Sequence, residues 1–162
     1  GRQALPCAAS RDHVLEFFAE LARARPGGPT AVGPDLLGIV QAVSRRGLAV
    51  VISDFFTADD SAFELLRPLP AHRQEPVVFQ VLCPEELELP EDGQWLLEDA
   101  ETGEERLIDL DAARRGYRER LEAFCARVRS ECEAHEFDYV RLATDQPLDQ
   151  ALRAYLERRT RL

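Results

Sequence analysis

The sequence predicts an α/β domain with a mostly parallel sheet and helices on both faces of that sheet. Three short apolar segments, residues 48–53, 76–82 and 137–142, have the length and β-branched content of strands, and the first two suit buried strands of a parallel sheet. Segments with helical periodicity separate these strands, and strands joined by helical crossovers pair in parallel with right-handed connections. A chain of 162 residues is long enough for one such domain, although three strands make a thin sheet.

The composition is that of an ordinary globular protein, with 45% hydrophobic and 31% charged residues. The net charge of −10, with basic and acidic residues interleaved on the predicted helices, argues against a nucleic-acid partner, because such a surface repels phosphates. No apolar run approaches the ~20 residues that span a bilayer, and no signal-like segment opens the chain. We therefore expect a cytoplasmic protein without a membrane partner. The absence of any Met favours a fragment excised from a longer chain.

The four cysteines, Cys7, Cys83, Cys125 and Cys132, form no CxxC motif and have no histidines at zinc-site spacing. Cys125 and Cys132 are seven residues apart on one predicted helix, about 10 Å along its axis, which is too far for a disulfide. We expect the cysteines to be small buried side chains in a reducing compartment.

Two helices are predicted before any strand. Ser10 can cap the first, which ends before Pro26 and has apolar residues at i, i+3, i+4 and i+7 spacing: Val14, Phe17, Phe18 and Leu21. The second is predicted from about Pro34 to the terminating Gly47, with one apolar face formed by Leu36, Leu37, Val40 and Val43. These helices need more sheet surface than three strands supply.

Strand 48–53 is the segment around which we expect the fold to be organised. Its apolar run ends at Ser53 and Asp54, so a hydroxyl and a carboxylate lie at the carboxyl end of the strand. Open α/β sheets bind ligands and metals at that end. The alternative is that Asp54 only caps the following loop or the helix that begins near Asp59, and the spacing leaves both interpretations open.

The second half of the chain contributes a hairpin and three more helices. The first of these helices follows Asp59 and Asp60 and turns Phe63, Leu66 and Leu69 inward. Residues 94–99 and 105–109 predict an exposed β-hairpin, in which Trp95 either makes an outside contact or, as we favour, pins the hairpin to the body. Asp111 can cap a long helix with Tyr117, Leu121, Phe124, Val128 and Cys132 on one face. A final helix after Pro147 turns Leu148, Leu152 and Tyr155 inward.

Four segments, residues 48–54, 81–90, 97–104 and 137–149, resemble in their order those of the bacterial domain of unknown function 58 family. The resemblance covers nearly the whole chain from about Val14. It implies a von Willebrand factor A-like, Rossmann-like three-layer domain with an inserted hairpin. It also implies a non-enzymatic adaptor or assembly chaperone that works with a MoxR-type AAA+ ATPase.

The resemblance further implies a metal-ion-dependent adhesion site at the carboxyl edge of the sheet. The usual ligands are an Asp-x-Ser-x-Ser motif after the first strand, a Thr from a later loop and an Asp after the fourth strand. The Thr maps to Thr30 and the Asp to Asp54, whereas the Asp-x-Ser-x-Ser motif is absent from the 162 residues. We therefore interpret residues 1–162 as a single, truncated domain that lacks the first strands of the family fold.

The predicted binding residues are Thr30, Ser53, Asp54 and Asp145, with Thr30 and Asp54 as an incomplete metal site and no catalytic residue. Mg²⁺ requires near-octahedral oxygen coordination, and Thr30 and Asp54 supply one neutral oxygen and one carboxylate, with at most Ser53 or Asp145 nearby. We expect weak or no Mg²⁺ binding by this chain alone. The alternative for Thr30 is a helix N-cap.

The missing neighbour would leave strand 48–53 with a bare apolar edge, which predicts a homodimer through that edge. The favoured function is an interaction module that presents the face near Thr30, Asp54 and Asp145 to a protein partner. The alternative is a Mg-dependent hydrolase or phosphotransferase using Asp54, but no Gly-rich phosphate loop, Gly-x-Ser-x-Gly or Asp-x-Asp after the strand supports it. A fragment without independent activity is the third interpretation.

Overall fold

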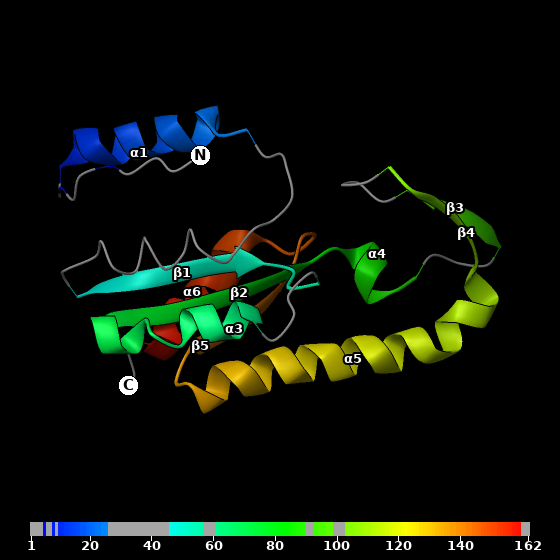
Figure 1. Cartoon of the computed structure of the whole chain (residues 1–162). Helices are drawn as coiled ribbons and strands as arrows, with labels where there is room; N and C mark the ends of the chain where they lie inside the picture. Colours follow the sequence, from blue (N-terminus) through cyan, green and yellow to red (C-terminus); the bar gives the residue numbers. More distant parts are fainter. Residues whose placement is uncertain are drawn as a thin grey trace.

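The computed structural model describes residues 5, 8, 10–25, 46–56, 61–89, 93–98 and 103–159. Its elements are α1 Arg11–Arg23, β1 Gly47–Ser53, α3 Ser61–Leu66, the 3₁₀ helix η1 Pro70–His72, β2 Gln74–Leu82, α4 Pro84–Leu87, β3 Gln94–Glu98, β4 Glu105–Asp109, α5 Leu110–Ala134, β5 Asp138–Ala143 and α6 Leu148–Arg159 (Figure 1). Thr30 and the helix expected after Pro34 lie outside the described residues, apart from Arg46 at its end.

The main sheet has three parallel strands in the order β1-β2-β5, which confirms the predicted parallel α/β arrangement. β2 is the central strand, with Val50 opposite Val77 on one side and Val77 opposite Asp138 on the other. Within the described residues no strand pairs with the outer side of β1, so β1 is an edge strand as expected. β3 and β4 form a separate antiparallel hairpin.

The prediction of buried strands holds for β2 and is wrong for β1, which we expected to be covered on both faces. Val77 and Val78, which point to opposite faces of β2, are fully buried. In β1, Ala49 and Val51 pack against the core, whereas Leu48, Val50 and Ile52 are 49%, 49% and 70% exposed. This face of β1 is exposed because α6 packs on β2 and β5, and the buried cluster there consists of residues from β2, β5 and α6.

Helices cover the two faces of β2 with separate apolar clusters. On the Val78 face, α3 and α5 contribute Phe63, Leu66, Val128 and Cys132. On the Val77 face, Tyr155 of α6 packs edge-on against Phe79, with ring centroids 5.7 Å apart. The inward positions predicted from helical spacing in the third and long helices are therefore confirmed, including Leu69, which lies just beyond α3.

α1 forms as predicted but does not bury its apolar stripe. Ser10 is the N-cap, and its Oγ accepts a hydrogen bond from the His13 backbone N–H at 3.2 Å. No residue of the helix is buried, and the stripe of Val14, Phe17, Phe18 and Leu21 is 48–59% exposed. Figure 1 shows α1 lying apart from the sheet.

α5 carries the chain from the hairpin back to the sheet (Figure 1), and its 25 residues span about 37 Å. It begins at Leu110, so Asp111 lies inside the helix rather than before it. Trp95 on the hairpin is 43% exposed, which contradicts the expectation that it pins the hairpin to the body. The short helix α4 was not predicted; Tyr117 of α5 holds it by donating a hydrogen bond to the Glu86 carbonyl oxygen at 2.7 Å.

Cys83, Cys125 and Cys132 are free thiols; Cys125 and Cys132 are buried as expected, Cys83 is only partly buried, and Cys7 lies outside the described residues. Burial raises the pKa of Cys132 from an ordinary value of 9.0 to about 12. Burial likewise raises the pKa of Tyr139 on β5 from 10.0 to about 12. In both cases desolvation disfavours the charged form.

These two pKa shifts predict a loss of stability at alkaline pH. The folded state holds both protons more tightly than the unfolded state, so the free energy of unfolding is at its full value below about pH 9 and falls as the pH rises toward 12. Urea unfolding at pH 8 and pH 10.5 measures the difference. A Cys132→Val variant, which removes one of the two acids, should show a smaller difference; an equal one would contradict the assignment.

Candidate functional site

Ser53 and Asp54 lie at the carboxyl end of β1, where both side chains organise a tight turn. The Ser53 Oγ accepts a hydrogen bond from the Phe55 N–H, and one Asp54 carboxylate oxygen, Oδ1, accepts one from the Phe56 N–H, each at 3.1 Å. Phe55 has a φ of 66°, a left-handed conformation that is costly for a bulky residue. The interpretation of Asp54 as a cap of its loop is thus supported, while its carboxylate remains exposed.

A buried glutamine, which the sequence analysis missed, lies beneath this turn. Gln80 of β2 is 0% exposed, and its Nε2 donates a hydrogen bond to the Asp54 carbonyl oxygen at 3.2 Å. Its Oε1 accepts a hydrogen bond from the Tyr139 hydroxyl at 2.7 Å. Gln80 of β2 therefore links the carboxyl end of β1 to Tyr139 of β5. Its signal in the sequence was a single polar residue inside the apolar run 77–82.

Asp145 reaches the same edge of the sheet from a different strand. It follows β5, where the Thr144 N–H donates to the Leu82 carbonyl oxygen at 3.0 Å. Because β2 lies between β1 and β5, the strands that lead to Asp54 and Asp145 are about 10 Å apart. The two carboxylates therefore share an edge without forming one cluster with Ser53. Among the described residues, no three His, Cys, Asp or Glu side chains come together as metal ligands.

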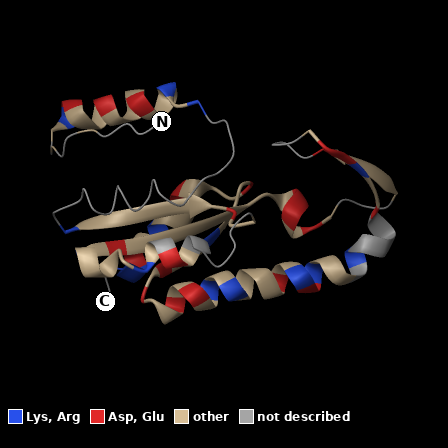
Figure 2. Ribbon diagram, viewed as in Figure 1, with Lys and Arg blue, Asp and Glu red and all other residues tan. Residues whose placement is uncertain are grey.

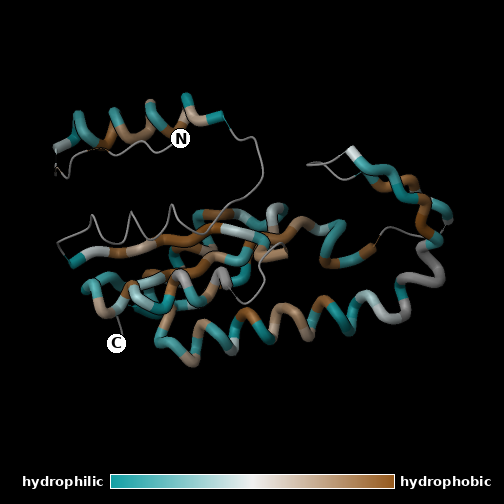
Figure 3. The backbone as a smooth tube through the Cα atoms, viewed as in Figure 1, coloured by the Kyte–Doolittle hydropathy of each residue, from teal (hydrophilic) through white to brown (hydrophobic). Residues whose placement is uncertain are grey.

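An apolar groove of about 590 Å³ lies beside this edge, on the face of the sheet that α6 covers. One wall is the exposed side of β1, with Leu48, Val50 and Ile52. The opposite wall is α6, and its residues Leu148 and Leu156 are each 59% exposed. The expectation that Leu148 turns inward was therefore wrong, whereas Tyr155, at the floor of the groove, is buried. Figure 3 shows the apolar stretches along β1 and β2.

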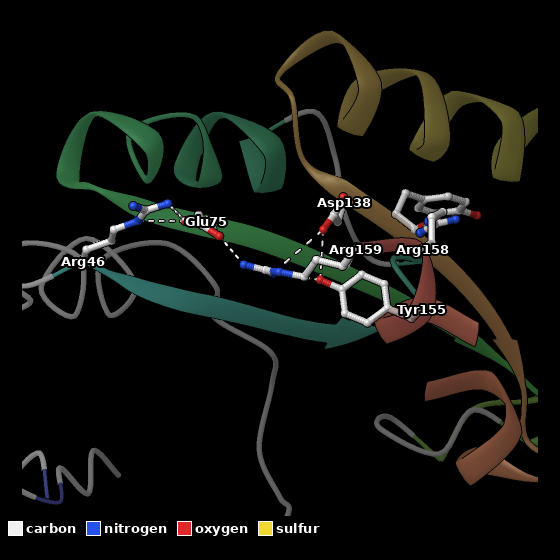
Figure 4. A network of polar contacts seen from close by, with 7 residues as sticks. Arg46, Glu75, Asp138, Tyr155, Arg158 and Arg159 are labelled. Carbon is white, nitrogen blue, oxygen red and sulfur yellow. Dashed lines mark hydrogen bonds and ion pairs between the residues drawn. The ribbon is translucent and has the colours of Figure 1, made fainter. Parts of the chain in front are cut away.

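A polar network at the opposite, amino-terminal end of the strands holds α6 in place (Figure 4). Arg46 and Arg159 both pair with Glu75 of β2, and the Arg46 guanidinium is the main cause that holds the pKa of Glu75 below its usual value. The Tyr155 hydroxyl donates to Asp138 of β5 at 2.9 Å and accepts from Arg159 at 3.0 Å. The network fixes the α6 wall of the groove relative to the sheet.

Charge is distributed unevenly over the described chain (Figure 2). Basic and acidic residues alternate along α5, as predicted, and several form ion pairs such as Arg129 with Glu133 at 3.4 Å. The residues that line the apolar groove, by contrast, include no charged side chain. None of the described helices combines the length and apolarity needed to cross a bilayer.

Comparison with known sequences places most of the chain in one family. The family with the description "Protein of unknown function DUF58" matches residues 1–130. Uncharacterized protein Rv1480 of Mycobacterium tuberculosis is 35% identical over 117 residues, which cover 68% of this chain and 35% of that protein. Uncharacterized protein MAV169 of Mycobacterium avium is 40% identical over 93 residues, covering 54% of this chain and 53% of that protein. The chain thus spans about a third to a half of these relatives, and no solved structure matches it.

Proposed function

Because this chain belongs to the DUF58 family, we propose that it is a non-enzymatic module that binds protein partners and works with a MoxR-type AAA+ ATPase in complex assembly. The observation that carries the proposal is the exposed apolar side of β1, where Leu48 and Val50 are about half exposed and Ile52 more so, at a strand edge that no described strand covers. Contiguous apolar surface of this kind is typical of sites that bind other proteins.

The proposal also covers the type of α/β fold and the cellular location of the protein. The β1-β2-β5 sheet is the carboxyl-terminal part of a von Willebrand factor A-like domain, and the chain works in the cytoplasm. Thr30 and Asp54 are then the remainder of an adhesion site that binds Mg²⁺ weakly. The exposed Asp54 carboxylate and the three-stranded sheet are compatible with this assignment.

Binding to a purified MoxR-type ATPase tests the proposal directly. We expect the chain to bind the ATPase in a calorimetric titration and Ile52→Glu to weaken binding at least tenfold, because the new charge would have to be desolvated at the contact. Arg106→Glu on the hairpin is the matched surface control and should leave binding unchanged. Absence of binding by the unaltered chain, or equal weakening by both variants, would contradict the proposal.

The proposed homodimer pairs the outer edge of β1 with its copy, and a proline at residue 50 tests it. The Gly47 N–H donates to the Arg73 carbonyl oxygen on the β2 side. Because bonding direction alternates along a strand, the Val50 N–H points to the outer edge. Val50→Pro therefore removes an outward donor without breaking a bond to β2. We expect light scattering to change from dimer to monomer; a monomeric unaltered chain would refute edge pairing.

The exposed carboxylate of Asp54 also allows the alternative of a Mg-dependent hydrolase or phosphotransferase. A phosphatase assay with Mg²⁺ distinguishes the two functions. Turnover that Asp54→Ala abolishes, with the circular dichroism spectrum unchanged, would favour the enzyme over the binding module.

A further inference from the structure

The exposed apolar residues of the chain are concentrated on two separate surfaces. Of the fifteen large apolar residues that are exposed in the described part of the chain, ten lie either on α1 or along the walls of the apolar groove. Those on α1 are Val14, Leu15, Phe17, Phe18 and Leu21, and those on the groove walls are Leu48, Val50, Ile52, Leu148 and Leu156. Among the described residues of the same copy, none covers either surface.

We propose that α1 of a second copy docks in the apolar groove, and that the two copies exchange these helices reciprocally. The inference rests on the proposed self-association of the chain, but not on edge pairing; in such a dimer α1 covers the apolar side of β1, so a protein partner has to displace α1 to bind there. The dimensions match, since the 13 residues of α1 span about 20 Å and the seven residues of β1 about 23 Å. The spacing of Val14, Phe17, Phe18 and Leu21 is that of a helix that docks in an apolar groove.

The charges of the two surfaces fit this contact. No charged side chain among the described residues lines the groove, and four of the five charged residues of α1, Asp12, Glu16, Glu20 and Arg23, lie on the side of the helix away from the Phe17 and Phe18 stripe, while Arg11 lies at its first turn on the same side as Phe18. Docking therefore buries apolar surface, with Arg11 at the end of the helix as the charge nearest to the contact. The polar side of α1 carries Asp12, Glu16 and Glu20, which disfavours an anionic membrane as the alternative occupant.

A second copy is favoured as the partner because the two surfaces belong to one chain and so occur in equal numbers. A two-fold pair that exchanges α1 covers both helices and both grooves at once and leaves no complementary surface free for further growth. α1 lies apart from its own sheet in the structure, with no buried residue, which is the arrangement that exchange requires (Figure 1).

Cysteine crosslinking between differently labelled chains tests the exchange. Chains carrying Phe18→Cys are mixed with chains carrying Leu156→Cys and oxidised mildly, with the unaltered chain as the background. We expect a crosslinked heterodimer, and none when Leu107→Cys on the hairpin replaces Leu156→Cys. A crosslinked monomer from one chain carrying both Phe18→Cys and Leu156→Cys would show docking within one copy and overturn the proposal, as would the absence of any crosslink.

The strength of association provides a second, independent measurement. Phe17→Glu with Phe18→Glu should raise the dimer dissociation constant at least tenfold, and Leu156→Glu on α6 should do the same without altering β1. The folded body should survive, because neither change removes a buried side chain. Glu16→Gln is the control. A dimer that Val50→Pro dissociates but these variants do not would retain edge pairing and overturn helix exchange.

Discussion

Replacing Gln80 with leucine is expected to lower the free energy of unfolding by about 2–5 kcal/mol, because two polar groups lose their buried partner at once. The Tyr139 hydroxyl now donates to the Gln80 Oε1, and the Asp54 carbonyl oxygen accepts from the Gln80 Nε2. Leucine fills a similar volume but bonds to neither group. Urea unfolding of Gln80→Leu and of the unaltered chain measures the loss.

A double-mutant cycle separates the hydrogen bond to Tyr139 from the change in packing. Tyr139→Phe alone should cost about 1–2 kcal/mol, because it leaves the buried Gln80 Oε1 without its donor. Combined with Gln80→Leu it should cost less than the sum of the single effects, since the second change removes a group that has already lost its partner. Additive effects would show that the two side chains act independently.

Truncation of Leu66 to alanine is expected to destabilise the fold by about 2–5 kcal/mol. Leu66 is 2% exposed and belongs to the cluster that joins α3 and α5 to β2 through Val78 and Val128. The loss combines the transfer of the removed methyl groups with the cavity that they leave. Thermal and urea unfolding measure it, with the 65% exposed Leu107→Ala as a control that should change stability by less than about 0.5 kcal/mol.

The elements that the sequence predicted well are those whose signal is local. The spacing of Leu121, Val128 and Cys132 identified the buried face of α5, and the apolar run of residues 76–82 identified β2 as a buried strand, although not as the central one. The exposure of Ile52 was not predictable in this way, because the same run of residues suits a strand with one covered face or two. Which applies depends on where α6 packs, and that is decided by contacts between distant segments.

In the candidate site, too, local features were predictable from the sequence, and contacts between distant segments were not. The position of Asp54 at the end of a strand followed from the sequence, and the structure confirms it. The distance between Asp54 and Asp145 depends on strand order, which no local pattern encodes, and the structure places β2 between their strands. The pairing of Gln80 with Tyr139 joins residues that are 59 positions apart. In the sequence, this pairing was indicated only by Gln80 as the single polar residue of the apolar run 77–82.

The second outer strand, β5, decides whether copies of this chain can assemble without limit. A head-to-tail addition of β1 onto β5 would continue indefinitely and produce filaments, whereas two β1 edges that pair with each other produce a finite particle. Arg158 donates a hydrogen bond to the Tyr139 carbonyl oxygen of β5, Arg129 of α5 lies beside that strand, and Arg141 belongs to it. Guanidinium groups along a strand oppose its extension by an apolar neighbour. We therefore expect this side of the sheet to oppose head-to-tail growth.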